Sequence, residues 1–126
     1  MKNLFISIIL FFLLNVCILI SINYLNKTCK NLITINSQIQ SSIKENSWAK
    51  AEALTEGFSK EWISHTKMLS VFVDHKEMDE INIEFYKLMK YVSNESTDEA
   101  SASSNVISFF LNHIMEMEKI NPQNIF

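Results

Sequence analysis

Residues 4–22 read LFISIILFFLLNVCILISI, and this stretch decides the architecture of the chain. It contains nineteen residues and no charge; Lys2 precedes it, and Lys27 and Lys30 follow it. A helix rises about 1.5 Å per residue, so this length gives about 28 Å, close to the roughly 30 Å hydrocarbon thickness of a bilayer. The stretch, called the apolar segment below, predicts a transmembrane anchor behind a short tail of residues 1–3.

A cleaved signal peptide is the alternative interpretation of the apolar segment. Its run exceeds the roughly 7–15 apolar residues of a signal peptide, and no Ala-x-Ala pattern follows it. Neither Cys17 nor Cys29 follows the small residues that lipoprotein processing requires. We therefore expect an uncleaved signal-anchor and a single-pass protein of the cytoplasmic membrane. The flanking lysines are nearly balanced, so they fix the orientation weakly; we expect the N-terminus inside and the body outside.

The rest of the chain, residues 23–126, has the pattern of an all-α domain. Gly57 and Pro122 are its only Gly and Pro, which leaves few of the turn residues that sheets need. The periodicity predicts helices at about 23–45, 47–73, 75–93 and 97–121, the first continuing the anchor without a break. Short polar corners between them predict an antiparallel four-helix bundle.

Caps and apolar stripes define these helices. Asn46 or Ser47 is expected to cap the second helix, Asp74 with Glu77 the third, and Ser96 with Glu99 the fourth. Gly57 is expected to let a neighbouring helix approach, and the apolar residues of the tail 123–126 are expected to fold back onto the bundle. The expected core positions are Leu25, Thr28, Leu32, Ile35, Ile39 and Ser42; Trp48, Ala51, Thr55, Phe58, Trp62, His65, Leu69 and Phe72; Met78, Ile81, Phe85, Leu88 and Val92; and Ala100, Ser103, Ile107, Phe110, Ile114 and Met117.

The charge of the chain excludes one class of partner. There are fourteen Asp and Glu against eleven Lys, no Arg, and a formal net charge of −3. Nucleic acid binding depends on neutralising phosphates, so we expect no nucleic acid partner.

The two cysteines cannot pair with each other. On one continuous helix, twelve residues separate Cys17 and Cys29 by about 18 Å, beyond the reach of a disulfide. Cys29 lies outside the apolar segment, where it is either a free thiol or a link between two chains.

A metal site is the sharpest chemical hypothesis. Glu61 and His65 are four residues apart on one helix, and His113 and Glu116 are three apart on another, so each pair shares a face. Metal proteins with helical bundles use such pairs, although the spacing and order differ here from di-iron bundles. The alternative is that His65 is a hydrogen-bonded boundary residue and the acids are solvated. We expect no metal, no cofactor and no catalytic residues, because no nucleophile–base set, phosphate-binding loop or CxxC pattern is present.

Asn15 is the one strongly polar residue in the apolar segment. An amide in lipid seeks a hydrogen-bond partner, which another transmembrane helix could supply for about 1–2 kcal/mol. The alternative is that Asn15 is tolerated near a water-accessible end of the segment.

The arrangement resembles a family of small, single-pass, membrane-anchored helical proteins of Gram-positive, spore-forming bacteria, a domain of unknown function. The residues that carry the resemblance are the N-terminal span, Trp48, Ala49, Ala51, Trp62, Val71, Phe72, Val73, Asp74, His75, Ile81, Glu116, Met117, Glu118, Asn124, Ile125 and Phe126. The resemblance implies anchoring and a helical architecture, and it implies no activity.

The pattern as a whole favours a non-enzymatic protein that binds another protein, either a membrane neighbour or a second copy of itself. Two alternatives stay open. One is an extracytoplasmic bundle that senses or binds a small molecule between its helices. The other is a metal-dependent enzyme using Glu61, His65, His113 and Glu116.

Overall fold

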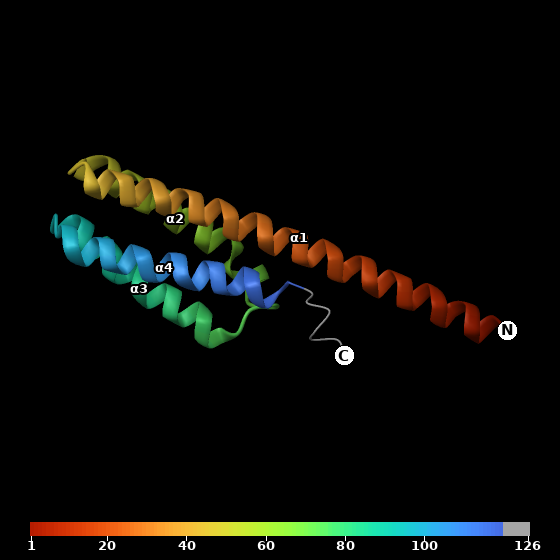
Figure 1. The fold of residues 1–126 in the computed structure, drawn as a ribbon. Helices are drawn as coiled ribbons and strands as arrows, with labels where there is room; N and C mark the ends of the chain where they lie inside the picture. The colour runs from red at the N-terminus through yellow and green to blue at the C-terminus, as the bar shows by residue number, and fades with distance from the viewer. Residues whose placement is uncertain (120–126) are drawn as a thin grey trace.

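The computed structural model describes residues 1–119, and within that range the chain forms four α helices (Figure 1). They are α1 (Lys2–Lys44), α2 (Trp48–Leu69), α3 (His75–Ser93) and α4 (Thr97–Met117). Each helix packs on the next one along the chain, and α4 also packs on α1, which closes a four-membered ring. The prediction of an all-α chain with four packed helices is confirmed.

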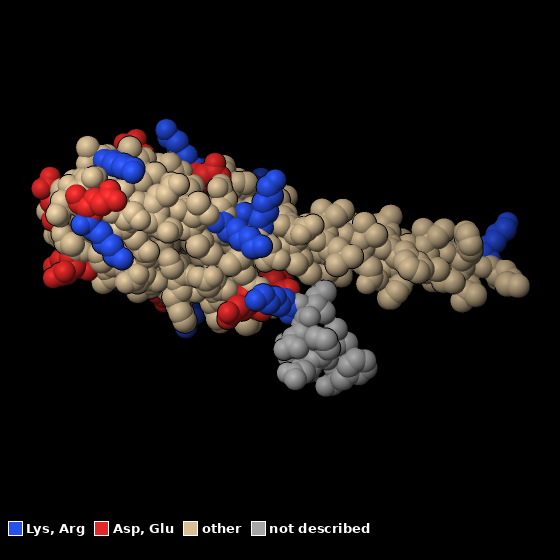
Figure 2. All heavy atoms as spheres, turned by 45° about the horizontal axis from the view of Figure 1, so that its top comes forward, with Lys and Arg blue, Asp and Glu red and all other residues tan. Residues whose placement is uncertain are grey.

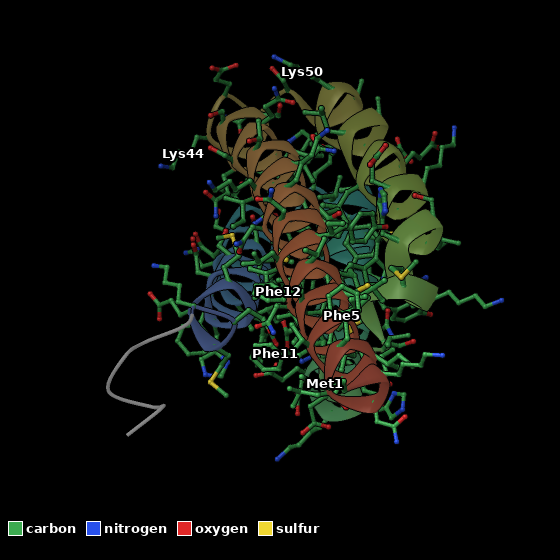
Figure 3. All side chains as sticks on the ribbon, turned by 90° about the vertical axis from the view of Figure 1, so that its right-hand side faces the viewer. Met1, Phe5, Phe11, Phe12, Lys44 and Lys50 are labelled. Carbon is green, nitrogen blue, oxygen red and sulfur yellow. The ribbon has the colours of Figure 1, made fainter. Side chains whose placement is uncertain are left out.

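The first helix is far longer than the other three. It runs for 43 residues without a break, and its N-terminal part projects alone beyond the bundle (Figure 1). Residues 1–20 are exposed, and the bundle begins to cover α1 at Ser21. Seen from the free end, Phe5, Phe11 and Phe12 project from α1 in more than one direction (Figure 3). The apolar segment therefore has almost no protein around it.

The α1–α2 and α3–α4 corners, which lie at the end of the bundle away from the apolar segment, share one geometry. Asn46 and Glu95 each adopt φ 55°, the left-handed conformation that commonly ends a helix. The next residue donates its N–H five residues back, from Ser47 to Ser42 and from Ser96 to Tyr91, each at 2.9 Å. These bonds satisfy carbonyl groups that the helix ends would otherwise leave free.

Only one of the expected caps uses its side chain. Asp74 accepts a hydrogen bond from the Lys76 N–H at 3.2 Å, as a helix cap should. Ser47 and Ser96 occupy the cap positions of α2 and α4, but their hydroxyls make no capping bond. Glu77 does not complete a capping box at Asp74, because its carboxylate engages His113 of α4 instead.

The core follows the expected stripes closely in α3 and less closely elsewhere. All five expected positions of α3 are buried. In α2, which ends at Leu69 and not near residue 73, the following turn leaves Phe72 38% exposed and buries Val73 instead. In α4, Ser104 and Leu111 are buried, whereas Phe110 is half-buried and Met117 is exposed.

The fourth helix ends earlier than expected. It stops at Met117, four residues short of the predicted end near residue 121. None of residues 115–119 is buried, so core packing no longer supports the helix there. The expected fold-back of the tail 123–126 lies outside the described residues.

Large aromatic side chains join α2 to α3, the least extensive of the interfaces between consecutive helices. The rings of Phe58 and Phe85 stack with their centroids 4.7 Å apart, and Trp62 Nε1 donates to Asn82 Oδ1 at 2.7 Å. The expected role of Gly57 is wrong. A Cβ added there would meet no atom within 4 Å, so no helix approaches it.

Candidate functional site

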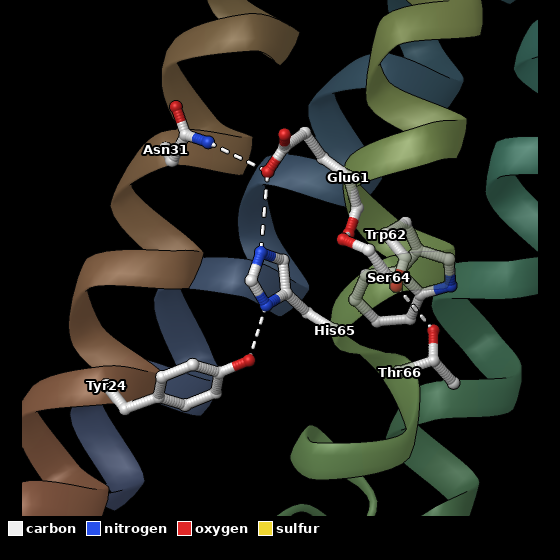
Figure 4. Close-up of polar contacts among 7 residues, drawn as sticks. All are labelled: Tyr24, Asn31, Glu61, Trp62, Ser64, His65 and Thr66. Atoms are coloured by element: carbon white, nitrogen blue, oxygen red, sulfur yellow. Dashed lines mark hydrogen bonds and ion pairs between the residues drawn. The ribbon is translucent and has the colours of Figure 1, made fainter.

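A chain of polar side chains joins α1 to α2 near the end of the bundle where the apolar segment emerges. Tyr24 and Asn31 come from α1, and Glu61 and His65 come from α2 (Figure 4). The α1 members are seven residues apart and the α2 members four apart, so each pair lies along one helix face. We call these four residues the polar relay.

The imidazole of His65 is held on both sides. Its Nδ1 is hydrogen-bonded to the hydroxyl of Tyr24, and its Nε2 lies 3.5 Å from Glu61 Oε2 (Figure 4). The same carboxylate oxygen accepts a hydrogen bond from Asn31 Nδ2 at 3.2 Å. A neutral imidazole that carries its proton on Nε2 would satisfy both partners, since Nδ1 could then accept from Tyr24.

The relay borders a groove, called the polar groove because its lining residues are polar in type, although carbon atoms make up most of its lining surface. Tyr24 and His65 line it together with Lys27, Thr28 and Asn31, and its volume is about 310 Å³. Residues that carry hydroxyl, amide, imidazole and ammonium groups thus line one small space. Such a set suits hydrogen bonding to a small polar or anionic group.

The hydroxyl groups next to His65 in sequence are engaged elsewhere. Ser64 Oγ donates to the carbonyl of Glu61 at 2.8 Å, and Thr66 Oγ1 donates to that of Trp62 at 2.6 Å (Figure 4). Neither hydroxyl is therefore positioned by His65 as an activated nucleophile.

In the second candidate pair of the metal hypothesis, His113 is engaged by a residue of another helix. His113 Nδ1 lies 2.6 Å from Glu77 Oε1 of α3, and its ring stacks on Phe109 with centroids 6.1 Å apart. Glu116, its expected partner, is exposed. Within residues 1–119, no three His, Cys, Asp or Glu side chains lie close enough together to hold a metal ion. The four metal candidates thus do not form one site.

Two further residues considered in the sequence analysis are Asn15 and Cys29. Asn15 is exposed on α1, and its Nδ2 donates to the carbonyl of Phe11 at 2.7 Å. Cys29 is fully buried, and burial raises the pKa of its thiol to about 11. A thiol enclosed in this way cannot link two folded chains, so the free-thiol interpretation holds.

Tyr24, Lys27 and Asn31 were missed by the sequence interpretation, which followed only the expected core spacing along α1. A signal was present, because residues 24, 27, 28 and 31 have the i, i+3, i+4, i+7 spacing of one helix face. Their partner His65 was assigned to the apolar stripe of α2, and it lies at the edge of that stripe.

The fold and the site define a helical bundle with a bare apolar extension and a polar groove where the two parts meet. A family model matches residues 19–125, which cover the whole bundle: it is DUF4363, a domain of unknown function. The chain belongs to this family. Comparison with curated proteins gave no match, and comparison with solved structures gave none either.

Proposed function

We propose that this protein is a single-pass membrane protein whose bundle acts by binding another protein at the outer face of the cytoplasmic membrane. The partner is a membrane protein neighbour or a second copy of the chain. The observation that carries the proposal is the bare apolar half of α1. The most apolar 18-residue window of α1 is 0% buried, whereas the apolar helix of a soluble core would be covered by its own protein.

The continuity of α1 supports an anchor over a removable leader. The helix passes from the apolar segment into the core without a break, and Leu25 is 1% exposed only three residues after the segment ends. A stiff helical connection fixes the position of the bundle relative to the bilayer. This geometry suits a protein that presents one surface to a neighbour in the same membrane.

Asn15 supports association within the membrane. Its Nδ2 donates one hydrogen bond to its own helix, which leaves a second N–H and the carbonyl oxygen of the amide for a neighbour. A second transmembrane helix could accept and donate at these atoms. The described residues offer no catalytic set that would favour an enzyme over a binding protein.

The experiment is chemical cross-linking of the full-length protein in its native membrane, followed by purification and mass spectrometry. A stoichiometric partner, or a cross-linked homodimer, is expected, and Asn15→Leu should reduce its yield. Recovery of the uncross-linked monomer alone, across a range of cross-linker lengths, would contradict action by protein association.

The polar groove favours a second candidate function, the binding of a small anionic molecule. Lys27 and His65 line this groove together with three further residues whose side chains can form hydrogen bonds, Tyr24, Thr28 and Asn31. Thermal unfolding with inorganic phosphate or glutarate tests this candidate. An increase in melting temperature that is lost in Lys27→Gln would support this function. The control Lys30→Gln, outside the groove, should still show the increase. No increase with either anion would contradict it.

A further inference from the structure

The two ends of the bundle differ in chemistry although both are built from tight helix corners. The far corners are polar: residues 45–47 read Glu-Asn-Ser and residues 94–96 read Asn-Glu-Ser. The near corner, between α2 and α3, contains Val71, Phe72 and Val73 instead. An apolar corner is unfavourable in water, so its position next to the apolar segment calls for an explanation.

Four exposed apolar side chains gather at this near end. Met68 lies in the last turn of α2, Val71 and Phe72 form the corner, and Met117 ends α4. Their exposed fractions range from 38% for Phe72 to 70% for Val71. We call these four residues the apolar foot.

The foot lies directly beside the apolar segment. Met68 and Phe72 share a groove with Ile20, Ser21 and Tyr24 of α1. Phe72 and Glu118 also line a second groove of about 250 Å³, whose α1 wall extends from Leu14 to Leu25 and supplies most of its apolar residues. The apolar surface therefore continues from the segment onto the end of the bundle.

The length of the apolar segment determines where the apolar foot lies relative to the bilayer. From Leu4 to Ser21, where the bundle first covers α1, a helix rises about 26 Å. This is less than the roughly 30 Å of a bilayer's hydrocarbon core, and the headgroup layers add several ångströms on each side. A bilayer that contains the segment must therefore reach the level of the foot.

Charged side chains surround the foot in the way expected at a headgroup layer. Lysine side chains lie at the end of the bundle where the uncharged helix emerges (Figure 2). Lys27, Lys67, Lys76 and Lys119 are exposed at this end, and long cationic side chains can extend from apolar surface to lipid headgroups. Four acidic residues lie at the same end: Asp74, Glu77, Glu116 and Glu118. They nearly cancel the attraction of the lysines to a negatively charged membrane surface. The apolar side chains must supply the contact.

From these observations we infer that the apolar foot inserts into the boundary between headgroups and acyl chains, and that its partner is the lipid bilayer itself. The inference rests on the proposed anchoring of the apolar segment. It adds that the bundle sits on the membrane surface with one defined end down. Because the local charge is balanced, the contact does not require anionic lipid.

Spin labels attached to single cysteines of the full-length protein test this inference. The background is Cys17→Ser, with the buried Cys29 retained. Labels are placed at Val71→Cys and Met117→Cys in the foot and at Leu10→Cys in the segment. Ile63→Cys is the matched control, because Ile63 is 70% exposed, as Val71 is, but lies further up α2. Accessibility to oxygen, which partitions into lipid, is compared with that to a polar nickel complex in phosphatidylcholine nanodiscs.

The expected result is an oxygen-to-nickel accessibility ratio several-fold higher at positions 71 and 117 than at position 63, and highest at position 10. A nickel-accessible label at position 71 beside a lipid-exposed label at position 10 would overturn the inference while leaving the anchor intact. A label at position 71 shielded from both reagents would place protein there and would also overturn it. A water-exposed label at position 10 would refute the proposed anchoring, and the inference with it.

Discussion

Asn36 on α1 and Ser104 on α4 exchange two hydrogen bonds in the centre of the bundle. Asn36 Nδ2 donates to the carbonyl oxygen of Ser104 at 2.8 Å, and Ser104 Oγ donates back to Asn36 Oδ1 at 2.9 Å. Asn36 Nδ2 also donates to Ser108 Oγ at 2.7 Å, and both Asn36 and Ser104 are 0% exposed. Both N–H groups and the oxygen of the amide are thus satisfied without water, which fixes the register of α1 against α4.

Replacing Asn36 by Leu should destabilise the fold although it adds apolar surface to the core. The substitution leaves the Ser104 hydroxyl buried without its acceptor, at a cost of about 1–3 kcal/mol in the free energy of unfolding. Denaturant unfolding of the detergent-solubilised protein, followed by circular dichroism, measures this change. Asn36→Leu combined with Ser104→Ala should recover part of the loss.

The control for this prediction is a second amide contact between the same helices. Gln40 Nε2 donates to Asn105 Oδ1 at 2.9 Å at an exposed position. Water can replace that bond, so Gln40→Leu should change the free energy of unfolding by less than about 0.5 kcal/mol. Equal effects of the substitutions at positions 36 and 40 would show that the buried network does not fix the helix register.

The burial of Cys29 predicts a loss of stability at alkaline pH. The thiol of the unfolded chain ionises near its ordinary pKa of 9.0, whereas in the folded chain burial raises the pKa to about 11. Between these values the folded state holds more protons than the unfolded state, so the free energy of unfolding falls as the pH rises. Raising the pH through this whole window should lower the free energy of unfolding by about 2–3 kcal/mol.

The measurement compares the wild-type protein with Cys29→Ala at pH 8 and pH 10.5. Other groups titrate equally in both proteins, so only the wild type should show the additional loss. Alkylation should agree with this result, with the Cys29 thiol modified only after denaturation. Identical pH dependence in the two proteins would show that the folded state does not protect the thiol.

Gly57 offers a substitution that should stabilise the protein. A methyl group at this helical position meets no atom within 4 Å, and alanine restricts the unfolded chain more than glycine does. Gly57→Ala should therefore raise the free energy of unfolding by about 0.5–1 kcal/mol. A lower melting temperature for the variant would instead reveal a close neighbour at Gly57.

Substitutions in the apolar segment test the role assigned to Asn15. Asn15→Leu should weaken association of the full-length protein in micelles by up to about 1–2 kcal/mol, measured by energy transfer between labelled chains. Ser7→Ala is the matched control, since the Ser7 hydroxyl already donates its only proton to the carbonyl of Asn3. Association that is equally strong in wild type and Asn15→Leu would remove Asn15 from the interface.

The sequence predicted buried positions best where the apolar spacing along a helix was the only factor that decided burial. In α3 the apolar spacing predicted all five buried positions, because nothing competes with burial along that face. At the end of α2 the same reasoning extended the apolar stripe to Phe72 and the helix to about residue 73. A turn that buries Val73 ends the helix at Leu69, and spacing within one helix cannot show which residue the next corner will bury.

The polar contacts were harder to predict because they depend on two helices at once. His65 was singled out, but its partner Tyr24 lies 41 positions away on α1. Glu77 was expected to cap its own helix, and it pairs with His113 of α4 instead. Asn36 drew no attention, since an amide in a helix resembles a surface residue until the facing helix supplies its partners.

The most direct test of the account concerns the anchor and the side on which the bundle lies. Ile63→Cys in the Cys17→Ser background provides one exposed thiol on the bundle, which a membrane-impermeant maleimide can modify in intact cells. We predict full labelling of intact cells, together with retention of the protein in the membrane pellet after alkaline carbonate extraction. Release of the protein by carbonate would contradict the anchor, and labelling only after lysis would contradict the proposed orientation.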